Sequence, residues 1–267
     1  MCLKSVNVLS PRRHLSVSEK FKKDQVNESR GFSRVYARFI YDQEKKKNFH
    51  QLSAIVGISV GQQAHEGEKL KATINLANKC FHSVSVAVCD TLQRHTMRIG
   101  TEFSAEEMYE ESRLNGVRWL ARNLDNIYRI NPDIKIWRWD EWLFRDDFQE
   151  KKALLNELYH TDPIYKEKMD STIKDFEVRF SKRGTLDSSN QIRYASYEYL
   201  IEECAIIMMM WKEYDYNYII YPSKILAIME ATHAKFSKRE DKEMLEWLRI
   251  KLKTKYIANS QEELCLA

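Results

Sequence analysis

The chain has 267 residues, of which 43% are hydrophobic, and it contains only 7 glycines and 4 prolines. This composition supports a sizeable core and long helices, excludes a low-complexity chain and argues against a β-sandwich. The net charge of +4 is uneven, because residues 1–48 carry 12 basic and 5 acidic residues whereas the remainder carries 31 and 34. The basic front end favours a polyanion such as RNA, although on charge alone a solubilising loop at Lys45–Lys47 is the simpler explanation.

The five cysteines are odd in number and form no C-x-x-C pair, which is typical of reduced thiols in a cytoplasmic protein. No apolar run reaches membrane-spanning length, and the first residues lack the apolar core of a signal peptide, so we expect neither export nor a membrane. The seven histidines show no metal-ligand spacing, and phosphate-binding glycine motifs are missing. We therefore expect no metal and no cofactor.

In chain order, residues 1–30 are polar and without period, which predicts a mobile basic arm before a single domain over residues 31–267. The apolar stretch Phe32–Ile40 is a first strand or helix. Four β-branched or aromatic runs predict strands: Ala54–Val60, Val84–Asp90, Ile134–Trp139 and Asn217–Tyr221. Helical patterns cover His65–Phe81, Ala105–Ile130 with Ser104 as N-cap, Glu141–Lys182, Asn190–Tyr214, Ser223–Phe236 and Arg239–Lys253, with a loop at Arg183–Ser189.

The alternation of strands and helices predicts an α/β fold with a mostly parallel sheet. In such sheets the functional crevice lies beyond the carboxyl ends of the strands. Ser59 stands at such an end, in Gly57-Ile58-Ser59-Val60-Gly61, where flanking glycines allow a sharp turn and close approach of a substrate. The string fits the G-x-S-x-G nucleophile elbow of hydrolases, but a small residue that closes a strand often serves packing alone.

Tyr199 and Glu203 are four residues apart in a helical pattern and share one face, beside an apolar face that predicts burial. Burial raises the pKa of a carboxyl group, so Glu203 is a candidate proton acceptor or ammonium binder, or else one half of a structural ion pair. We expect Glu202, one position before it, to be a solvated charge. Tyr221 ends the last strand because Pro222 cannot continue the ladder; its hydroxyl either faces the crevice or packs at the rim.

Taken together and in order, these residues resemble the tRNA-dependent cyclodipeptide synthases over roughly residues 50–235. The family carries an early [LVI]-[LVI]-G-[LVI]-S, here Ile55-Val56-Gly57-Ile58-Ser59, then a Tyr and a Glu four apart, here Tyr199 and Glu203. A further Tyr follows about twenty residues later, here Tyr221. Gln62 and Pro222 match the branch of the family that has a variable residue and Tyr-Pro beside its active site.

The resemblance implies a Rossmann-like fold with helices on both faces, similar to the catalytic domains of tyrosyl- and tryptophanyl-tRNA synthetases but used without ATP. It also implies a ping-pong route in which Ser59 takes an aminoacyl group from a first aminoacyl-tRNA. Tyr199 and Glu203 would hold the ammonium group, and Tyr221 would position groups or relay a proton during ring closure. The substrate is already an activated ester, so positioning and proton transfer suffice.

The same resemblance implies binding residues. The first aminoacyl pocket, predicted to be apolar, and its rim would comprise Ile55, Gly57, Gln62, Ile206, Ile207 and Ile219. The acceptor stem of tRNA would meet basic side chains at Arg94, Arg98, Arg113, Arg118, Arg122 and Arg129. We expect a monomer, with a dimer as the alternative.

Two other functions fit parts of the sequence. An α/β-hydrolase-type serine esterase would use the same glycine-flanked serine, but it needs a downstream histidine, and His160 and His233 both lie in charged helical patterns. A non-catalytic tRNA-binding module explains the basic residues. It does not explain a buried Tyr199 and Glu203 beside a glycine-flanked serine.

Overall fold

The structure is a computed structural model that describes residues 32–41, 49–182, 189–213, 216–236 and 245–257. The basic arm expected over residues 1–30 lies outside the described residues. By compactness the chain divides into a larger unit, residues 35–253, and a smaller one of residues 1–34 and 254–267. The larger unit contains every element below except the outer ends of the first and last strands.

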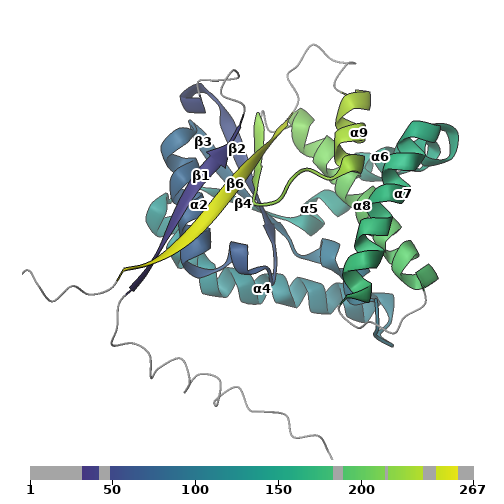
Figure 1. The fold of residues 1–267 in the computed structure, drawn as a ribbon, viewed down its shortest axis with the longest axis horizontal. Helices are drawn as coiled ribbons and strands as arrows, with labels where there is room; N and C mark the ends of the chain where they lie inside the picture. Colours follow the sequence, from purple (N-terminus) through teal and green to yellow (C-terminus); the bar gives the residue numbers. More distant parts are fainter. Residues whose placement is uncertain (1–31, 42–48, 183–188, 214–215, 237–244, 258–267) are drawn as a thin grey trace, which may run out of the picture. The chain divides into compact units, whose positions relative to one another are not determined.

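A six-stranded sheet forms the centre of the larger unit, in the order β1-β6-β5-β2-β3-β4 (Figure 1). Its strands are β1 (Phe32–Ile40), β2 (Ser53–Ser59), β3 (Ser83–Cys89), β4 (Lys135–Arg138), β5 (Tyr218–Tyr221) and β6 (Glu246–Ile257). β2 pairs in parallel with β3 and β5, β3 pairs in parallel with β4, and β5 with β6. The predicted α/β fold with a mostly parallel sheet is therefore confirmed, and β2, β3, β4 and β5 each lie within one residue of the bounds predicted for them.

Successive residues of a strand point to opposite faces, and this alternation divides the core in two. On one face Ala54, Val56 and Ile58 pack against helices α2 (Gly67–Cys80) and α4 (Ala105–Ile130). On the other, Ile55 and Ile219 pack against the remaining longer helices. These are α5 (Trp139–Leu143), α6 (Asp146–Thr161), α7 (Pro163–Ser181), α8 (Ser189–Glu213) and α9 (Ala227–Phe236). Helices therefore lie on both faces of the sheet around β2 and β5, as the fold class requires.

Local sequence signals explain the helix boundaries. Ser104 caps α4 in a capping box, because its hydroxyl accepts from the Glu107 N–H while the Glu107 carboxylate accepts from the Ser104 N–H. Asp162 caps α7 and Pro163 occupies the first turn. The long helical stretch predicted over Glu141–Lys182 therefore divides into the end of α5, α6 and α7. The loop predicted at Arg183–Ser189 lies outside the described residues except for Ser189, which begins α8.

The prediction of a helix over Arg239–Lys253 is wrong, because its second half belongs to strand β6. Leu248, Ile250 and Leu252 alternate with Arg249, Lys251 and Lys253. That is the period of two of a half-buried strand, and it outweighs the helix-forming lysines and leucines. The ambiguous stretch Phe32–Ile40 is also a strand, β1, with the same alternation of exposed and half-buried residues. β6 lies beside β5, which carries Tyr221, and β1 lies on the outer side of β6.

Helix α8 passes through the core, and its described side chains are buried on nearly all sides from Leu200 onward. Each fully buried aliphatic side chain contributes about 2 kcal/mol to stability, so packing fixes this helix firmly. Among the described residues, we find no helix with the length and apolar character needed to traverse a bilayer.

Candidate active site

The turn after β2 places Ser59 at the carboxyl edge of the sheet. Ser59 has the same parity as Ile55, so its side chain faces the α8 side. Gly61 adopts a φ of 84°, a left-handed conformation that favours glycine, and the Gln62 N–H donates to the Ser59 carbonyl at 3.2 Å. This turn ends the strand immediately after the serine and leaves Ser59 only 8% exposed.

The hydroxyl of Ser59 lies 2.7 Å from the hydroxyl of Tyr221, at the end of the neighbouring strand β5. Gln62 also donates from its amide to the Tyr221 hydroxyl, at 3.4 Å. Burial raises the pKa of Tyr221 to about 12, although its contact with Ser59 opposes that rise. Tyr221 is therefore a protonated phenol at neutral pH, which suits a relay or hydrogen-bond donor better than a base. Of the two alternatives for Tyr221, a hydroxyl at the crevice or a ring packed at the rim, the structure has the hydroxyl at the crevice.

His65 holds the backbone of Ser59, a role that was not predicted from the sequence. Its Nδ1 accepts from the Ser59 N–H at 2.9 Å, and its ring packs on Tyr221 with centroids 5.3 Å apart. Burial lowers the pKa of His65 to about 4, so the ring is neutral at physiological pH and can accept that hydrogen bond. The imidazole thus holds the backbone of Ser59 and is not paired with its hydroxyl.

Tyr199 and Glu203 approach the same space from α8. Burial raises the pKa of Glu203 to about 8, the charge of Arg179 opposes this, and the neighbouring charge of Glu202 adds to it. One carboxyl oxygen, Oε2, is buried without a hydrogen-bond partner in the described part of the chain. A buried acceptor without a partner is costly, and a substrate ammonium group would satisfy it.

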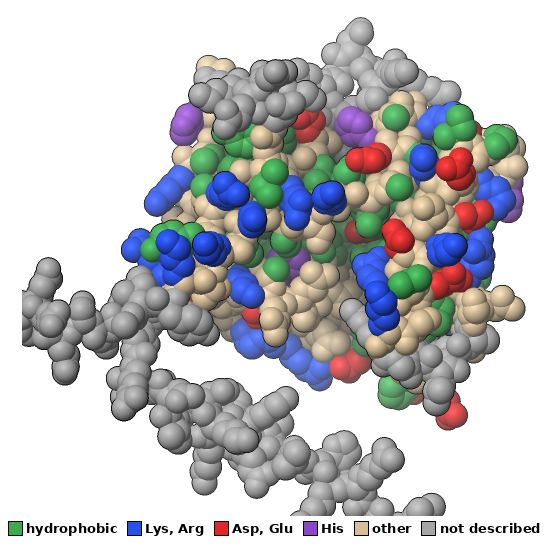
Figure 2. All heavy atoms as spheres, in the orientation of Figure 1, with side chains coloured by type: hydrophobic (Ala, Val, Ile, Leu, Met, Phe, Trp, Pro, Cys, Tyr) green, Lys and Arg blue, Asp and Glu red, His purple; other side chains and the backbone are tan. Residues whose placement is uncertain are grey.

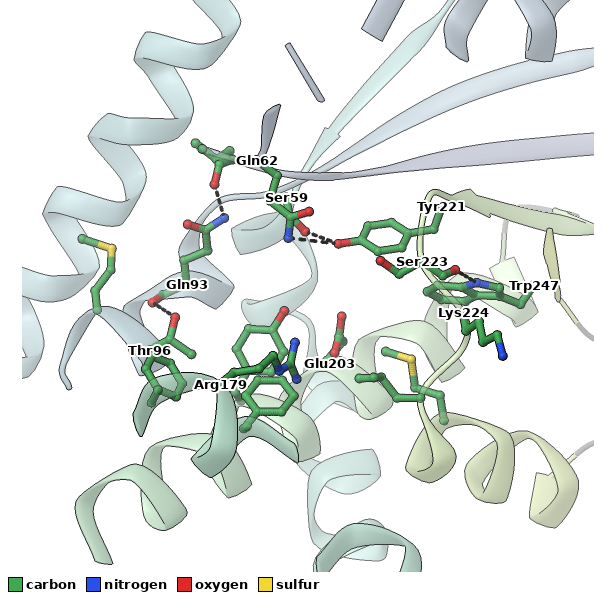
Figure 3. A pocket seen from close by; sticks show the side chains of 18 residues that line it. Ser59, Gln62, Gln93, Thr96, Arg179, Glu203, Tyr221, Ser223, Lys224 and Trp247 are labelled. Carbon is green, nitrogen blue, oxygen red and sulfur yellow. Dashed lines mark hydrogen bonds between the residues drawn. The ribbon is translucent and has the colours of Figure 1, made fainter. Parts of the chain in front are cut away.

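These side chains line one cavity of about 540 Å³. Ser59 and Tyr221 lie on the sheet side, and Glu203 and Arg179 point into the cavity from the helix side (Figure 3). Aromatic and apolar side chains complete the walls, among them Phe176, Phe180, Leu226, Met229 and Trp247. The predicted convergence of Ser59, Tyr199, Glu203 and Tyr221 at one place is therefore what the fold produces.

Glu202 is the clearest local error of the sequence reasoning, because it is 1% exposed and not a solvated charge. Arg94 donates to both of its carboxyl oxygens, at 2.8 and 2.5 Å. His95 Nε2 and Trp139 Nε1 each donate to one oxygen at 3.0 Å. Burial alone would raise the pKa of Glu202, but the hydrogen bonds from His95 and Arg94 outweigh it and lower the pKa to about 2.

The residues predicted for the first aminoacyl pocket lie beside the site in the core on the α8 side. Ile55, Ile206 and Ile219 are at most 7% exposed, and a Cβ on Gly57 would lie 3.4 Å from the Tyr221 ring. Of these predicted residues, Gln62 is the one that lines the cavity formed by the described side chains. The other five lie behind the cavity wall: Ile55, Gly57, Ile206, Ile207 and Ile219. Their role stays a prediction.

The arginines predicted for tRNA binding are largely engaged within the protein. Arg94 forms an ion pair with Glu202. Arg98 borders a second cavity of about 400 Å³ near the start of α4. On α4 each of three arginines pairs with an acidic residue: Arg113 with Glu110 at 3.1 Å, Arg118 with Glu111 at 2.9 Å and Arg122 with Glu66 at 2.8 Å. Arg129 is exposed near the end of α4. A contact with tRNA stays untested for all six.

A second basic surface was not predicted. Arg38 on β1 and Arg249, Lys251 and Lys253 on β6 follow the parity that faces away from the α2 and α4 core. Figure 2 shows basic side chains gathered over these two strands. None of the four forms an ion pair with another described residue. We call this set the β1–β6 basic face. Arg249 lies directly beside Tyr221 in the register of β5 and β6, so the face begins at the site.

A serine-hydrolase site requires a histidine at the serine hydroxyl. Here the hydroxyl of Ser59 meets the hydroxyl of Tyr221, and the hydrogen bond between Ser59 and His65 is made by the backbone of Ser59, not by its hydroxyl. His160 and His233, the late histidines considered above, are not among the described side chains that line the cavity. The geometry therefore disfavours the hydrolase alternative.

Comparisons with known proteins agree with this site. No family model matches the sequence, and no curated protein matches it. Among solved structures, a cyclodipeptide synthase from Fluoribacter dumoffii is 29% identical with a TM-score of 0.79, over 84% of this chain and 100% of that one. A cyclodipeptide synthase from Candidatus Glomeribacter gigasporarum, bound to Phe-tRNAPhe, is 18% identical with a TM-score of 0.62, over 78% and 90%.

A Mycobacterium tuberculosis protein is 15% identical with a TM-score of 0.58, over 83% of this chain and 96% of that one. Its structure has been described as demonstrating that cyclodipeptide synthetases are related to type I tRNA synthetases. The Rossmann-like fold predicted from the resemblance is thus confirmed. With the serine, the Tyr-x-x-x-Glu pair and the later tyrosine gathered in one cavity of that fold, the chain belongs to the cyclodipeptide synthase family.

Proposed function

We propose that this chain joins two aminoacyl groups, taken from two aminoacyl-tRNAs, into a cyclic dipeptide through an aminoacyl ester on Ser59. The observation that supports this most is the geometry of the cavity. A serine hydroxyl paired with a protonated tyrosine lies on one side, and a buried carboxyl with an unsatisfied oxygen lies on the other. Such a site can exchange one ester for another and accept a proton from an amine.

In the first step the Ser59 hydroxyl attacks the ester carbon of an aminoacyl-tRNA. A serine ester forms, the bond to the terminal ribose breaks, and the serine proton ends on the departing ribose oxygen. Tyr221 is 2.7 Å from the serine oxygen and is the natural relay for that proton. His65 keeps the serine backbone in place during this exchange.

In the second step the amine of the first residue attacks a second aminoacyl-tRNA. That amine must first lose a proton, and Glu203 is suited to take it because its pKa of about 8 is close to that of an α-amino group. The product is a dipeptide held on Ser59 and a second free tRNA. The new terminal amine then attacks the serine ester, which closes the ring and restores the hydroxyl.

The first aminoacyl group would be apolar, because the predicted pocket residues beside Ser59 are aliphatic or small. Ile55, Gly57 and Ile219 lie on the same sheet face as the serine, and Ile206 and Ile207 come from α8. A charged first side chain would have to bury its charge against these aliphatic side chains, which is costly.

The tRNA would lie along the β1–β6 basic face in preference to helix α4. Lys251 and Lys253 are exposed and project from the strand that also carries Trp247 into the cavity. Cations that are not already paired neutralise phosphates without first breaking an internal ion pair, so they contribute more to binding. A cytoplasmic location follows from this substrate, because aminoacyl-tRNA is available there.

The test is to incubate the purified protein with a mixture of aminoacyl-tRNAs and to identify 2,5-diketopiperazines by mass spectrometry. We expect a cyclic dipeptide without added ATP, and none with Ser59→Ala. Free amino acids with ATP in place of aminoacyl-tRNA are the control and are expected to give no product. A folded wild-type protein that only hydrolyses the ester, or only binds tRNA whether or not it is charged, would contradict the proposal.

A further inference from the structure

Two adjacent acids on α8 have opposite environments. The carboxyl of Glu203 faces the cavity and has an oxygen without a hydrogen-bond partner among the described residues, whereas the carboxyl of Glu202 faces away into a cluster of donors. Neighbouring residues on a helix are about 100° apart, so a donor cluster that fixes one carboxylate also fixes the direction of the other. The mechanism proposed above uses only Glu203.

The donor cluster around Glu202 comes from two distant segments. Arg94 and His95 belong to the short helix α3 (Arg94–Met97) after β3, and Trp139 begins α5. Arg94 also donates to the Thr91 carbonyl at 2.8 Å, which ties its guanidinium to the turn beyond β3. Glu202 is thus bound to the turns that follow β3 and β4, the same sheet edge where the serine lies.

Glu202 also acts on Glu203 through its charge. The groups whose charges or hydrogen bonds couple to Glu203 come from four elements: Arg179 on α7, Tyr199, Glu202 and Cys204 on α8, Cys89 on β3 and Tyr221 on β5. Arg179 favours the ionised carboxylate, whereas Glu202 disfavours it. Since Glu202 stays ionised at any physiological pH, it is a permanent negative charge beside the catalytic carboxyl.

We infer that Glu202 is a positioning residue for Glu203. Its two-point grip by Arg94 holds α8 so that Glu203 points into the cavity, and it places a fixed negative charge beside the carboxyl that handles the amine proton. This rests on the proposed function, in which Glu203 handles the amine proton. The inference gives Arg94 a role inside the protein, and its predicted contact with tRNA stays untested.

The structure offers a matched control in the ion pair of Asp90 with Arg138. Asp90 is 1% exposed, and Arg138 holds it through two nitrogens much as Arg94 holds Glu202. Asp90 also lies against α4, where a Cβ at Gly116 would collide with its carboxyl. It therefore tests what the loss of a buried ion pair does to stability without removing the charge next to Glu203.

The experiment compares Glu202→Gln with Asp90→Asn. Both are expected to lower the melting temperature. Only Glu202→Gln should move the acid limb of the pH profile of kcat/KM, to lower pH and by on the order of one unit, because a negative charge has been removed beside Glu203. An unshifted limb in Glu202→Gln, or an equal shift in Asp90→Asn, would overturn the inference.

A second variant tests positioning apart from charge and carries the test if Glu202→Gln does not fold. Arg94→Lys keeps the positive charge but loses the two-point grip. We expect kcat to fall about tenfold while KM for aminoacyl-tRNA and the acid limb stay in place. A higher KM with unchanged kcat would overturn the inference and assign Arg94 to tRNA binding.

A titration separates this inference from the proposed function. Glutamate labelled with 13C at the carboxyl reports the ionisation of Glu203 by NMR, and Glu203→Gln assigns the signal. If the wild type makes no cyclic dipeptide, the proposed function fails, yet Glu202→Gln must still lower the titration midpoint of Glu203. If it does not, the inference fails independently of activity.

Discussion

The two sides of the cavity differ in how their polar groups are satisfied. On the sheet side Ser59, Tyr221 and His65 are joined by short hydrogen bonds, and no charge is buried among them. On the helix side Glu203 has an elevated pKa, and one of its oxygens has no hydrogen-bond partner in the part of the chain that the structure describes. The sheet side is therefore preorganised for ester exchange, and the helix side is kept incomplete until an ammonium group arrives.

The largest effect is expected when the carboxylate of Glu203 alone is removed, which tests whether the two sides of the cavity have different roles. Glu203→Gln keeps the shape but cannot accept a proton, so we expect kcat for cyclic dipeptide to fall about 100-fold or more. Formation of the serine ester should be affected less, because Ser59 and Tyr221 remain. Single-turnover kinetics with one aminoacyl-tRNA distinguish the two steps. Equal losses in both would mean that the two sides do not divide the chemistry as described.

A smaller effect is expected on the sheet side. Tyr221→Phe removes the hydroxyl that lies 2.7 Å from the serine oxygen but leaves the ring against His65. One hydrogen bond of this kind is worth about 1 kcal/mol, so ester formation should slow about five- to tenfold. The rate of enzyme acylation measures this. Tyr216→Phe is a control, since the Tyr216 hydroxyl accepts from Trp137 at 3.0 Å, a separate hydrogen bond; an equal loss there would contradict a specific role.

The two basic surfaces extend the comparison to tRNA. Lys251→Ala with Lys253→Ala should weaken tRNA binding several-fold and reduce the slope of log affinity against log salt by about 2. Arg118→Ala with Arg122→Ala should do less, because both arginines are paired with acidic residues. Filter binding at several salt concentrations checks both pairs. A larger effect from the α4 pair would assign the tRNA to that helix.

The smallest effect concerns stability. Glu203 has a folded pKa of about 8 against an ordinary 4.5, so folding is favoured by its neutral form below pH 4.5, and this contribution is lost as pH rises toward 8. Glu203→Gln has no such loss. The difference in melting temperature, variant minus wild type, should therefore grow by a few degrees between pH 5 and 8. Calorimetry measures it, and a constant difference would contradict the burial of this carboxyl.

The sheet side was readable from the sequence because it depends on local signals. A β-branched run, the glycine after Ser59 and the proline after Tyr221 fix where each strand ends, and parallel strands bring those ends together. The period of two in β6 was present as well and was misread. His65 lies only six residues beyond Ser59, but nothing in the local sequence pattern indicates that the turn brings its ring back to the Ser59 N–H.

The helix side was only half readable. The spacing of Tyr199 and Glu203 predicts a shared face, but the environment of Glu202 depends on Arg94 and His95, more than a hundred residues earlier. The charge pattern along one helix cannot predict partners that come from a distant part of the sequence. The ion pairs of Arg113, Arg118 and Arg122 could not be predicted for a related reason, because a count of positive charge along a sequence does not show which charges pair in the fold.

The most direct test is to look for the ester on the serine. The wild-type protein is mixed with one aminoacyl-tRNA, quenched in acid and analysed by intact and peptide mass spectrometry. We predict a mass increase of one aminoacyl residue, located on Ser59 and missing in Ser59→Ala. Cyclic dipeptide formed at the normal rate by Ser59→Ala, or an adduct on another residue, would contradict the account.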